Sequence, residues 1–324
     1  MDFFHKQNRE PNIDWLGKKW YFLGFSLIFS VAGVLSMLFW HHIPVGVDFK
    51  GGTQIRVVFD QKPDENHIRQ ALDRAGVRNA SIQGISDPSG NAANKVVIGL
   101  PKSSATDAAH DKGREDVENA LNANYHDSKF EIEGVDIVGP TAGKQLQKQA
   151  MWAVIYSLAG MLIYLWFRFE FIYGVAAVVA VFHDTLITVG AFSLTNKEIS
   201  LTVIAAILTL IGYSMNDTIV VFDRIRENLG ISRRESLAEV VNRSINQTLS
   251  RTVLTSGLTF LTVLSLYLFG GEVLHGFSFA LVVGILIGTY SSIAVAAPML
   301  VAYREWRLRR GKTASLPASK RAKA

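Results

Sequence analysis

The stretch Gly212–Asn228 reads G-Y-S-M-N-D-T-I-V-V-F-D-R-I-R-E-N and places the carboxylate of Asp217 inside an apolar run long enough to cross a lipid bilayer. A charged side chain deep in a membrane helix costs at least about 2.5 to 3.5 kcal/mol on insertion scales, so it usually pairs, lines a water path or titrates. The stretch therefore predicts a membrane-spanning helix that forms part of an ion or proton pathway.

Apolar residues elsewhere in the chain are gathered into similar blocks. The 324-residue sequence is 49% hydrophobic, and its mean hydropathy is +0.20. A helix needs about 20 mostly apolar residues to cross a bilayer. Six segments of this kind, which predict an integral membrane protein, lie near residues 21–40, 150–166, 171–193, 201–222, 253–269 and 276–302.

The first apolar segment, residues 21–40, is either a secretory signal peptide or a retained anchor. Its apolar run is longer than the roughly 7 to 15 residues of a signal-peptide core, and no small-residue cleavage site follows in Ser36–His42. The sequence favours a retained anchor that forms the first transmembrane helix.

The distribution of Lys and Arg predicts the orientation, because cytoplasmic loops carry an excess of both. Basic residues cluster before the first segment, between the fourth and fifth, and after the sixth, whereas the two short loops on the other side hold only Lys197. Residues 1–20 and the tail 303–324 are therefore predicted to be cytoplasmic. The sequence pI of about 9.3 then reflects the basic residues on the cytoplasmic side. The basic tail is predicted to contact anionic lipid or solvent, and nucleic-acid binding is not supported.

Residues 41–149 are predicted to form a soluble α+β domain outside the cytoplasm. Strand patterns occur at Gln54–Phe59, Ala80–Ile85, Val96–Leu100 and Phe130–Val138, and helical patterns at Glu65–Gly76 and Gly113–Asn124. The turn-rich stretch Asp87–Asn91 separates the second and third strands. The order βαββαβ is that of a ferredoxin-like split βαβ unit.

Residues 150–302 are predicted to hold the remaining five spans, with one long inner connection at 223–251. Ser232 and Glu235 have the spacing of a capping box, and apolar residues recur every fourth position from Leu237 to Leu249. The pattern predicts an amphipathic helix near 231–249 on the inner face. Packing under the bundle and binding of a partner are both compatible with it.

Polar residues form a stripe on each of two neighbouring spans. The first stripe is Thr209, Tyr213, Asn216 and Asp217 on the fourth span, and the second is Arg251, Thr255, Thr259 and Thr262 on the fifth. The depths of Asp217 and Arg251 are compatible with contact, and movement of the guanidinium would load and unload a proton on the carboxylate. The alternatives are a static ion pair and an arginine that extends to the interface.

His183 and Asp184 lie near the middle of the third span. A proton relay and a buried carboxylate bonded to a neighbouring helix are both consistent with Asp184, whereas His183 fits a structural role better. Gly284 and Gly288 form a G-x-x-x-G pattern that predicts helix packing.

The stretch Val47–Thr53 lacks the spacing of a phosphate-binding loop, as does the rest of the chain, so ATP binding is not supported. Its glycine pair predicts a tight turn. No metal-ligand cluster or hydrolase site is recognisable in the outer domain, and with no cysteine the chain has no thiol chemistry. We expect neither a cofactor nor enzymatic activity.

Five motifs together resemble the SecF family of bacterial preprotein translocase subunits, over about residues 10–303. They are Val47–Gly52, Val138–Pro140, Phe167–Phe171, His183–Asp184 and Gly212–Asn228. The resemblance implies half of a resistance-nodulation-division (RND) type transporter that pairs with SecD, often with YajC, and docks on the SecYEG channel. It also implies use of a proton or sodium gradient to help draw preproteins across the inner membrane.

The resemblance implies that Asp217 and Arg251 are the ion-coupling residues of this chain. The other candidates are supporting or relay residues, namely Asn216, Tyr213, Asp184 and Thr255, and motif residues with structural roles, namely Asp48, Gly51, Gly52, Gly139 and Pro140. Two rival hypotheses are a small-molecule or lipid exporter of the same superfamily and a passive scaffold. The single six-span half and the small outer domain argue against the exporter.

Overall fold

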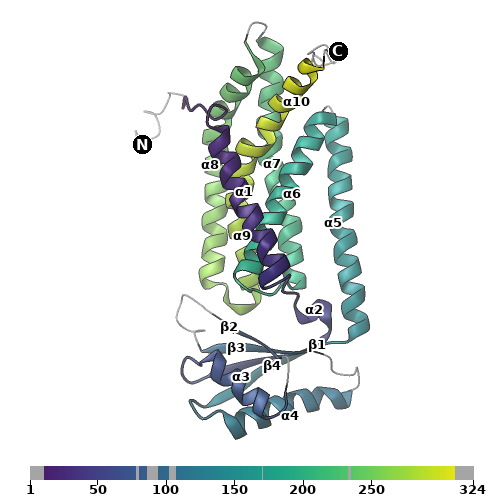
Figure 1. The fold of residues 1–324 in the computed structure, drawn as a ribbon, viewed down its shortest axis with the longest axis vertical. Helices are drawn as coiled ribbons and strands as arrows, with labels where there is room; N and C mark the ends of the chain where they lie inside the picture. Colours follow the sequence, from purple (N-terminus) through teal and green to yellow (C-terminus); the bar gives the residue numbers. More distant parts are fainter. Residues whose placement is uncertain are drawn as a thin grey trace.

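The computed structural model describes residues 11–77, 80–85, 94–101, 107–169, 171–232 and 235–310. A helical bundle stands on a small α+β domain (Figure 1). Six helices are long and apolar enough to cross a membrane, which confirms a multi-pass membrane protein: Lys19–Trp40, Thr141–Arg168, Phe171–Leu194, Leu201–Ile231, Leu237–Phe269 and Val273–Arg307.

The spans are built from α-helices with two π-helical turns. They are α1 (Lys19–Leu35) with η1 (Ser36–Trp40), α5 (Pro140–Arg168), α6 (Phe171–Leu194), α7 (Leu201–Ile231), α8 (Leu237–Phe269), and α9 (Gly271–Ser291) with η2 (Ser292–Ala296) and α10 (Ala297–Arg309). α5 begins about ten residues before the predicted span, because a polar helical stretch precedes the apolar one. Tail residues 311–324 lie outside the described residues.

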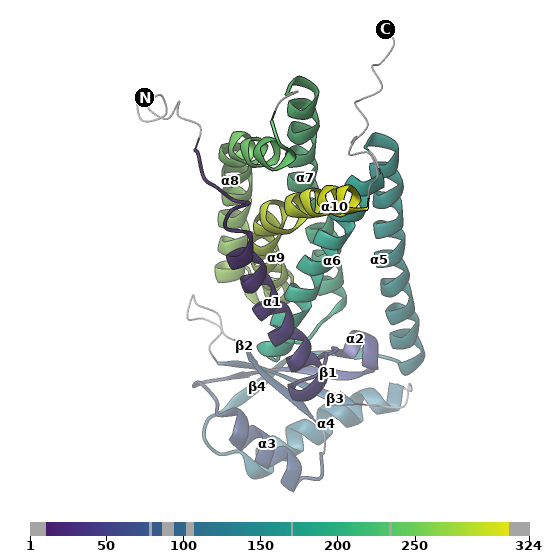
Figure 2. The same cartoon turned by 45° about the horizontal axis from the view of Figure 1, so that its top comes forward.

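The amphipathic helix expected near 231–249 corresponds to the first part of α8, which begins at Leu237 and continues without a break into the fifth span. Its apolar residues do face the core: Leu237, Val241 and Ile245 are buried. The expected capping box is also displaced, since Ser236 and Glu239 cap each other's backbone groups and α8 begins at Leu237. In Figure 2 the first turns of α8 lie at an angle to the rest of the helix.

α6, α7 and α9 form the centre of the bundle, whereas α1, α5 and α8 lie at its periphery. The predicted role of the G-x-x-x-G pattern is confirmed: Gly288 lies against Ser214 of α7, where an added Cβ would be 3.0 Å from the serine Cβ. Gly33 of α1 and Gly190 of α6 meet in the same way, so an added Cβ on Gly190 would be 2.8 Å from the Gly33 Cα. Glycine thus brings helix backbones close together.

The outer domain lies between the first and second spans. Its elements are α2 (Val47–Lys50), β1 (Gly52–Phe59), α3 (Glu65–Arg74), β2 (Ser81–Ile85), β3 (Lys95–Pro101), α4 (Asp107–Asn124) and β4 (Phe130–Val138). The strands form one antiparallel sheet in the order β2-β3-β1-β4. The predicted βαββαβ order is confirmed from β1 onwards, although α4 begins earlier than expected; the predicted turn at 87–91 lies outside the described residues.

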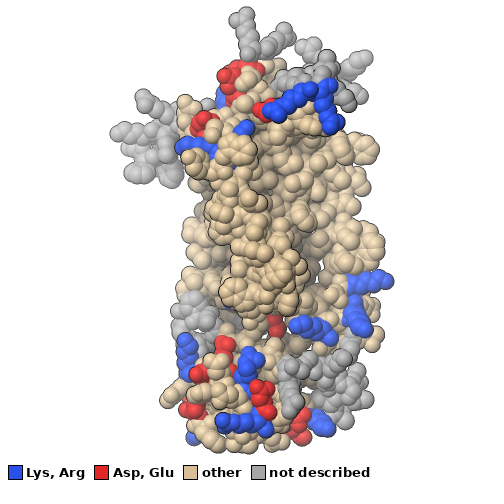
Figure 3. Space-filling model, viewed as in Figure 1, with Lys and Arg blue, Asp and Glu red and all other residues tan. Residues whose placement is uncertain are grey.

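The sheet has two unlike faces. Its apolar face packs on α3 and α4 around a separate core that includes Ile55, Ile68 and Leu121. The other face is turned toward the bundle (Figure 1). Charged side chains gather at the outer domain and at the opposite end of the molecule, and a band free of visible charge separates them (Figure 3). The band corresponds to the height of the apolar helices, as expected for the part within a bilayer.

Candidate functional site

Asp217 is buried between α7 and α8. Only 2% of the residue is exposed, and its Oδ2 accepts a hydrogen bond from Ser256 Oγ at 2.8 Å. The side chain of Asn216 also interacts with this carboxylate. Sequence analysis named Asp217 and Asn216 but missed Ser256 as the principal partner. A buried acid in a membrane helix, with a polar contact to the next helix, is an arrangement that can bind and release an ion.

The expected direct contact between Asp217 and Arg251 is absent from this conformation. Arg251 precedes Ser256 by five residues on α8, which is about 7.5 Å along the helix axis. Its side chain is exposed, and within the described ranges no ion pair joins it to a carboxylate. Its charge still acts on Asp217 through space.

The two predicted polar stripes do not enclose a path within this chain. Thr209, Asn216 and Thr255 are exposed, and the threonine hydroxyls donate to carbonyls of their own helices. The hydroxyl of Tyr213 is buried and has no hydrogen-bond partner among the described residues. Apart from the buried Asp217 and the buried hydroxyl of Tyr213, the stripes therefore form an outward-facing polar surface on α7 and α8.

Asp184 is the centre of a second buried polar cluster. Its Oδ2 accepts hydrogen bonds from Ser214 Oγ of α7 at 2.6 Å and from Ser291 Oγ of α9 at 2.7 Å. Its Oδ1 lies 2.9 Å from Nδ1 of His183, whose Nε2 is buried and lacks a partner among the described atoms. Asp184 therefore joins three helices, an observation that favours the structural interpretation.

The two polar clusters are adjacent along α7. Ser214, which bonds to Asp184, precedes Asp217 by three residues, or about 4.5 Å of helix rise. Ser214 lies within the stretch on which the sequence analysis began, but nothing in that pattern shows which helix its hydroxyl faces. A shift of α7 would act on both carboxylates together.

The outer motif residues hold the two ends of the domain to the bundle. Asp48 of α2 accepts a hydrogen bond from the backbone N–H of Leu201, the first residue of α7, at 2.8 Å. Gly51 and Gly52 have φ values of 72° and 143°, a region that favours glycine, which agrees with the predicted turn. Gly139 is the N-cap of α5, and Pro140 is its first residue.

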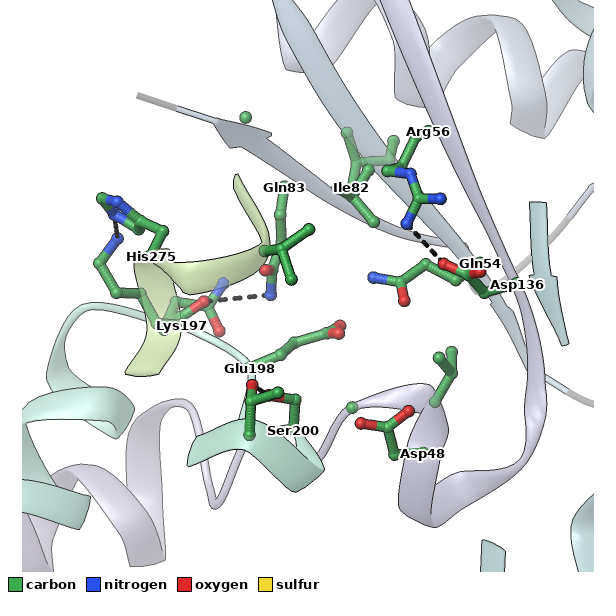
Figure 4. Close-up of a pocket in the computed structure, with 18 of the residues that line it drawn as sticks. Asp48, Gln54, Arg56, Ile82, Gln83, Asp136, Lys197, Glu198, Ser200 and His275 are labelled. Atoms are coloured by element: carbon green, nitrogen blue, oxygen red, sulfur yellow. Dashed lines mark hydrogen bonds and ion pairs between the residues drawn. The ribbon is translucent and has the colours of Figure 1, made fainter. Parts of the chain in front are cut away.

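A cavity of about 460 Å³ separates the polar sheet face from the ends of the membrane helices (Figure 4). Burial raises the pKa of Glu198; the Asp48 charge adds to this effect, while the Ser81 hydrogen bond and the Lys50 charge oppose it. Burial lowers the pKa of Lys197. The other labelled side chains that line the cavity are Gln54, Arg56, Ile82, Gln83, Asp136, Ser200 and His275.

No metal site is evident in the described part of the chain, where no three His, Asp or Glu residues are grouped to hold an ion. The polar clusters at Asp184 and Asp217 are each built on one carboxylate and serine hydroxyls. Such sites suit a proton or a loosely held cation better than a tightly coordinated metal.

Comparison with known proteins gives consistent matches. A family model described as "Protein export membrane protein SecD/SecF, C-terminal" matches residues 117–306. Protein translocase subunit SecF of Koribacter versatilis is 53% identical, over 95% of this chain and 96% of that protein. The SecF subunit of Calditerrivibrio nitroreducens is 42% identical, over 95% of this chain and 99% of that protein.

A solved structure is also similar. The crystal structure of SecDF from Thermus thermophilus, described as a translocon-associated membrane protein, has a TM-score of 0.79 and 36% sequence identity to this chain. A crystal structure of SecDF in a super-membrane-facing form has a TM-score of 0.66 at the same identity. The first match covers 91% of this chain but only 39% of the SecDF chain, so this chain spans well under half of that longer protein.

Proposed function

The chain belongs to the SecF family of protein translocase subunits, and from this membership we propose that it works with a SecD-type partner to couple an ion gradient to the late stages of preprotein export. The coupling ion is a proton or a sodium ion. As a translocase subunit it moves a polypeptide rather than transforming a small substrate.

One observation carries the proposal: Asp217 is buried within the membrane bundle, beside an outward-facing polar surface on α7 and α8. That surface includes the exposed Arg251 at the inner start of the fifth span, where an unpaired arginine costs less than the roughly 2.5 to 3.5 kcal/mol that insertion scales give at a helix centre. A second helical bundle laid against α7 and α8 removes this cost. The solved SecDF chain, in which the matched region is 39% of the length, supports a SecD-type bundle as that partner.

The proposed coupling step is protonation of Asp217. A neutral carboxyl group no longer attracts Arg251, so α7 and α8 can shift relative to each other. One elementary charge that crosses 100 mV releases about 2.3 kcal/mol, enough to bias two conformations that differ by a few kcal/mol. The outer domain and its counterpart in the partner then move while they hold an unfolded segment of the preprotein.

The proposed topology places the outer domain in the periplasm and both chain termini in the cytoplasm of a bacterial inner-membrane protein. The first turns of α1 and the last turns of α10 lie at the end of the bundle away from the outer domain (Figure 1). Basic residues gather toward that end, in agreement with the positive-inside rule. YajC, the SecYEG channel, preproteins and membrane lipid are the further partners proposed from the family resemblance.

The test is gradient-dependent preprotein translocation in inverted membrane vesicles that contain SecD and this chain. Asp217→Asn is expected to abolish the gradient-dependent part at matched complex levels. Asp223→Asn is the control, because it makes the same change on the same helix at an exposed carboxylate paired with Arg168 at 3.1 Å. Full gradient-dependent translocation by Asp217→Asn would refute ion coupling through this residue and favour a passive scaffold.

A further inference from the structure

The outer domain is connected to the bundle by two adjacent crossings of the chain. The first passes through Gly51 and Gly52 into β1, and the second leaves β4 at Val138 and passes through Gly139 into α5. Gly52 and Val138 are paired in the sheet, so the crossings lie side by side. Two adjacent crossings at glycine define a single line about which the domain can turn.

The helix α2, which precedes the first crossing, is fixed to the bundle by its contacts. An added Cβ on Gly143 of α5 would lie 2.9 Å from the carbonyl oxygen of Phe49, so α2 and α5 pack at backbone distance. The Asp48 carboxylate binds the N-terminus of α7. Ile199 also exchanges two backbone hydrogen bonds with the residues before α2, at 2.7 Å to Pro44 and 3.0 Å from Gly46. The line of rotation therefore lies beyond α2.

The far edge of the sheet makes a second and weaker connection, here called the clasp, between Ser81 and Gln83 of β2 and Asn196 and Glu198 of the loop 195–200. Gln83 Nε2 donates to the carbonyl oxygen of Asn196 at 3.4 Å. The Ser81 hydroxyl donates to the Gly99 carbonyl at 3.5 Å and lies close enough to the Glu198 carboxylate to oppose the rise in its pKa. The clasp borders the polar cavity (Figure 4). The Gln83–Asn196 hydrogen bond is near the upper limit of length for a hydrogen bond, whereas the bonds beside α2 are short.

We propose that the outer domain is a lever that turns about Gly51–Gly52 and Gly139, and that the clasp opens and closes during transport. Strands are about 4.8 Å apart, so β2 lies roughly 10 Å from β1 and 14 Å from β4. A rotation of about 20° then displaces β2 by roughly 3 to 5 Å, which breaks the clasp. The proposal rests on the proposed function, because the loop 195–200 joins α6, which holds Asp184, to α7, which holds Asp217.

In this arrangement Asp48 and the loop 195–200 are positioning elements for the membrane acids. Asp48 keeps the start of α7 fixed to α2, so the pivot stays in place while the clasp moves. When the clasp closes, the loop is held at both ends of the cavity, and when it opens, only the contacts beside α2 remain. Movement of a polypeptide held by the outer domain can thus reach α6 and α7 through one loop.

The absence of cysteine from the chain allows a direct test. A Gln83→Cys/Asn196→Cys variant is treated in inverted vesicles with a short, membrane-permeable bis-thiosulfonate cross-linker, with SecD present. Cross-linking is expected to reduce gradient-dependent translocation to the level of Asp217→Asn, and reductant to restore it. The control is Gln83→Cys/Val97→Cys, whose positions are paired within the sheet and do not cross the line of rotation.

Undiminished gradient-dependent translocation by the cross-linked clasp variant would overturn the lever, as would failure of the short cross-linker to join its two cysteines. Before cross-linking, the same variant reports on the proposed function separately. If it shows a gradient-dependent part that cross-linking leaves intact, only the lever fails. If neither it nor the unmodified chain shows a gradient-dependent part, the proposed function fails and the lever with it.

Discussion

The buried bond between Ser291 and Asp184 is expected to contribute measurable stability to the bundle. Ser291 Oγ donates to Asp184 Oδ2 across the interface of α6 and α9 at 2.7 Å. Its neighbour Ser292 is equally buried, but its hydroxyl donates to the Thr289 carbonyl within the same chain segment. Ser291→Ala and Ser292→Ala therefore remove the same atom from two adjacent buried positions, and only the first loses a bond between helices.

Interhelical hydrogen bonds in membrane proteins contribute about 0.6 kcal/mol on average and up to about 1.7 kcal/mol. The short bond and complete burial place Ser291→Ala toward the upper part of this range. Asp184→Ala also removes the bond from Ser214, so its expected cost is about twice as large, roughly 1.2 to 3.4 kcal/mol. Ser292→Ala is expected to cost less than about 0.5 kcal/mol, as do substitutions that break no such contact.

The assay is reversible unfolding of the purified chain in mixed micelles by titration with sodium dodecyl sulfate, arranged as a double-mutant cycle. Asp184→Ala combined with Ser291→Ala should give a coupling energy of about 0.6 to 1.7 kcal/mol. The cycle with Ser292→Ala should be additive within about 0.5 kcal/mol. Equal losses for the two serine variants, or a zero coupling energy for Ser291, would refute the assignment of Asp184 as a three-helix junction.

Three further predictions follow from local geometry. Gly190→Val should destabilise the bundle by about 1 to 3 kcal/mol in the same titration because it separates α1 from α6, whereas Gly24→Val, with open space around it, should cost little. Ser236→Ala should increase hydrogen exchange at the first amides of α8, with a loss of about 1 kcal/mol, and Ser232→Ala should leave them protected. Burial raises the pKa of Glu198 above its ordinary 4.5, so the closed clasp should lose stability as pH rises through that raised value. Distances between spin labels placed across the cavity should lengthen over the same pH range. Glu198→Gln should remove this pH dependence.

Features that depend on local pattern could be predicted from the sequence. The six spans follow from hydropathy, and β4 begins and ends at the predicted residues because its strand pattern is bounded by polar and glycine residues. The start of α8 was misplaced because the spacing Ser-x-x-Glu occurs twice, four residues apart, at Ser232 and Ser236. Both have the local chemistry of a cap, and the choice between them depends on where α7 ends and on how the helix packs.

Contacts between distant residues could not be predicted. Nothing near Asp217 in the chain indicates that its partner is Ser256 rather than Arg251, because both residues of α8 are close enough along the helix to reach the depth of Asp217 in the bundle. Asp48 and Leu201 are separated by 153 positions, so the bond that joins the outer motif to the start of α7 has no local signature. Such pairings follow from how the helices pack.

The pairing of Gly52 with Val138 also affects how the protein can be altered. Paired residues in an antiparallel sheet have Cα atoms about 4.5 to 5.5 Å apart, so the chain leaves and re-enters the bundle at almost the same point. Viewed from the membrane, the outer domain is an insertion with coincident ends, of the kind that can be exchanged or enlarged as a cassette. Because the Asp48 contact lies on the bundle side of this joint, a change within the cassette leaves the contact between α2 and α7 in place.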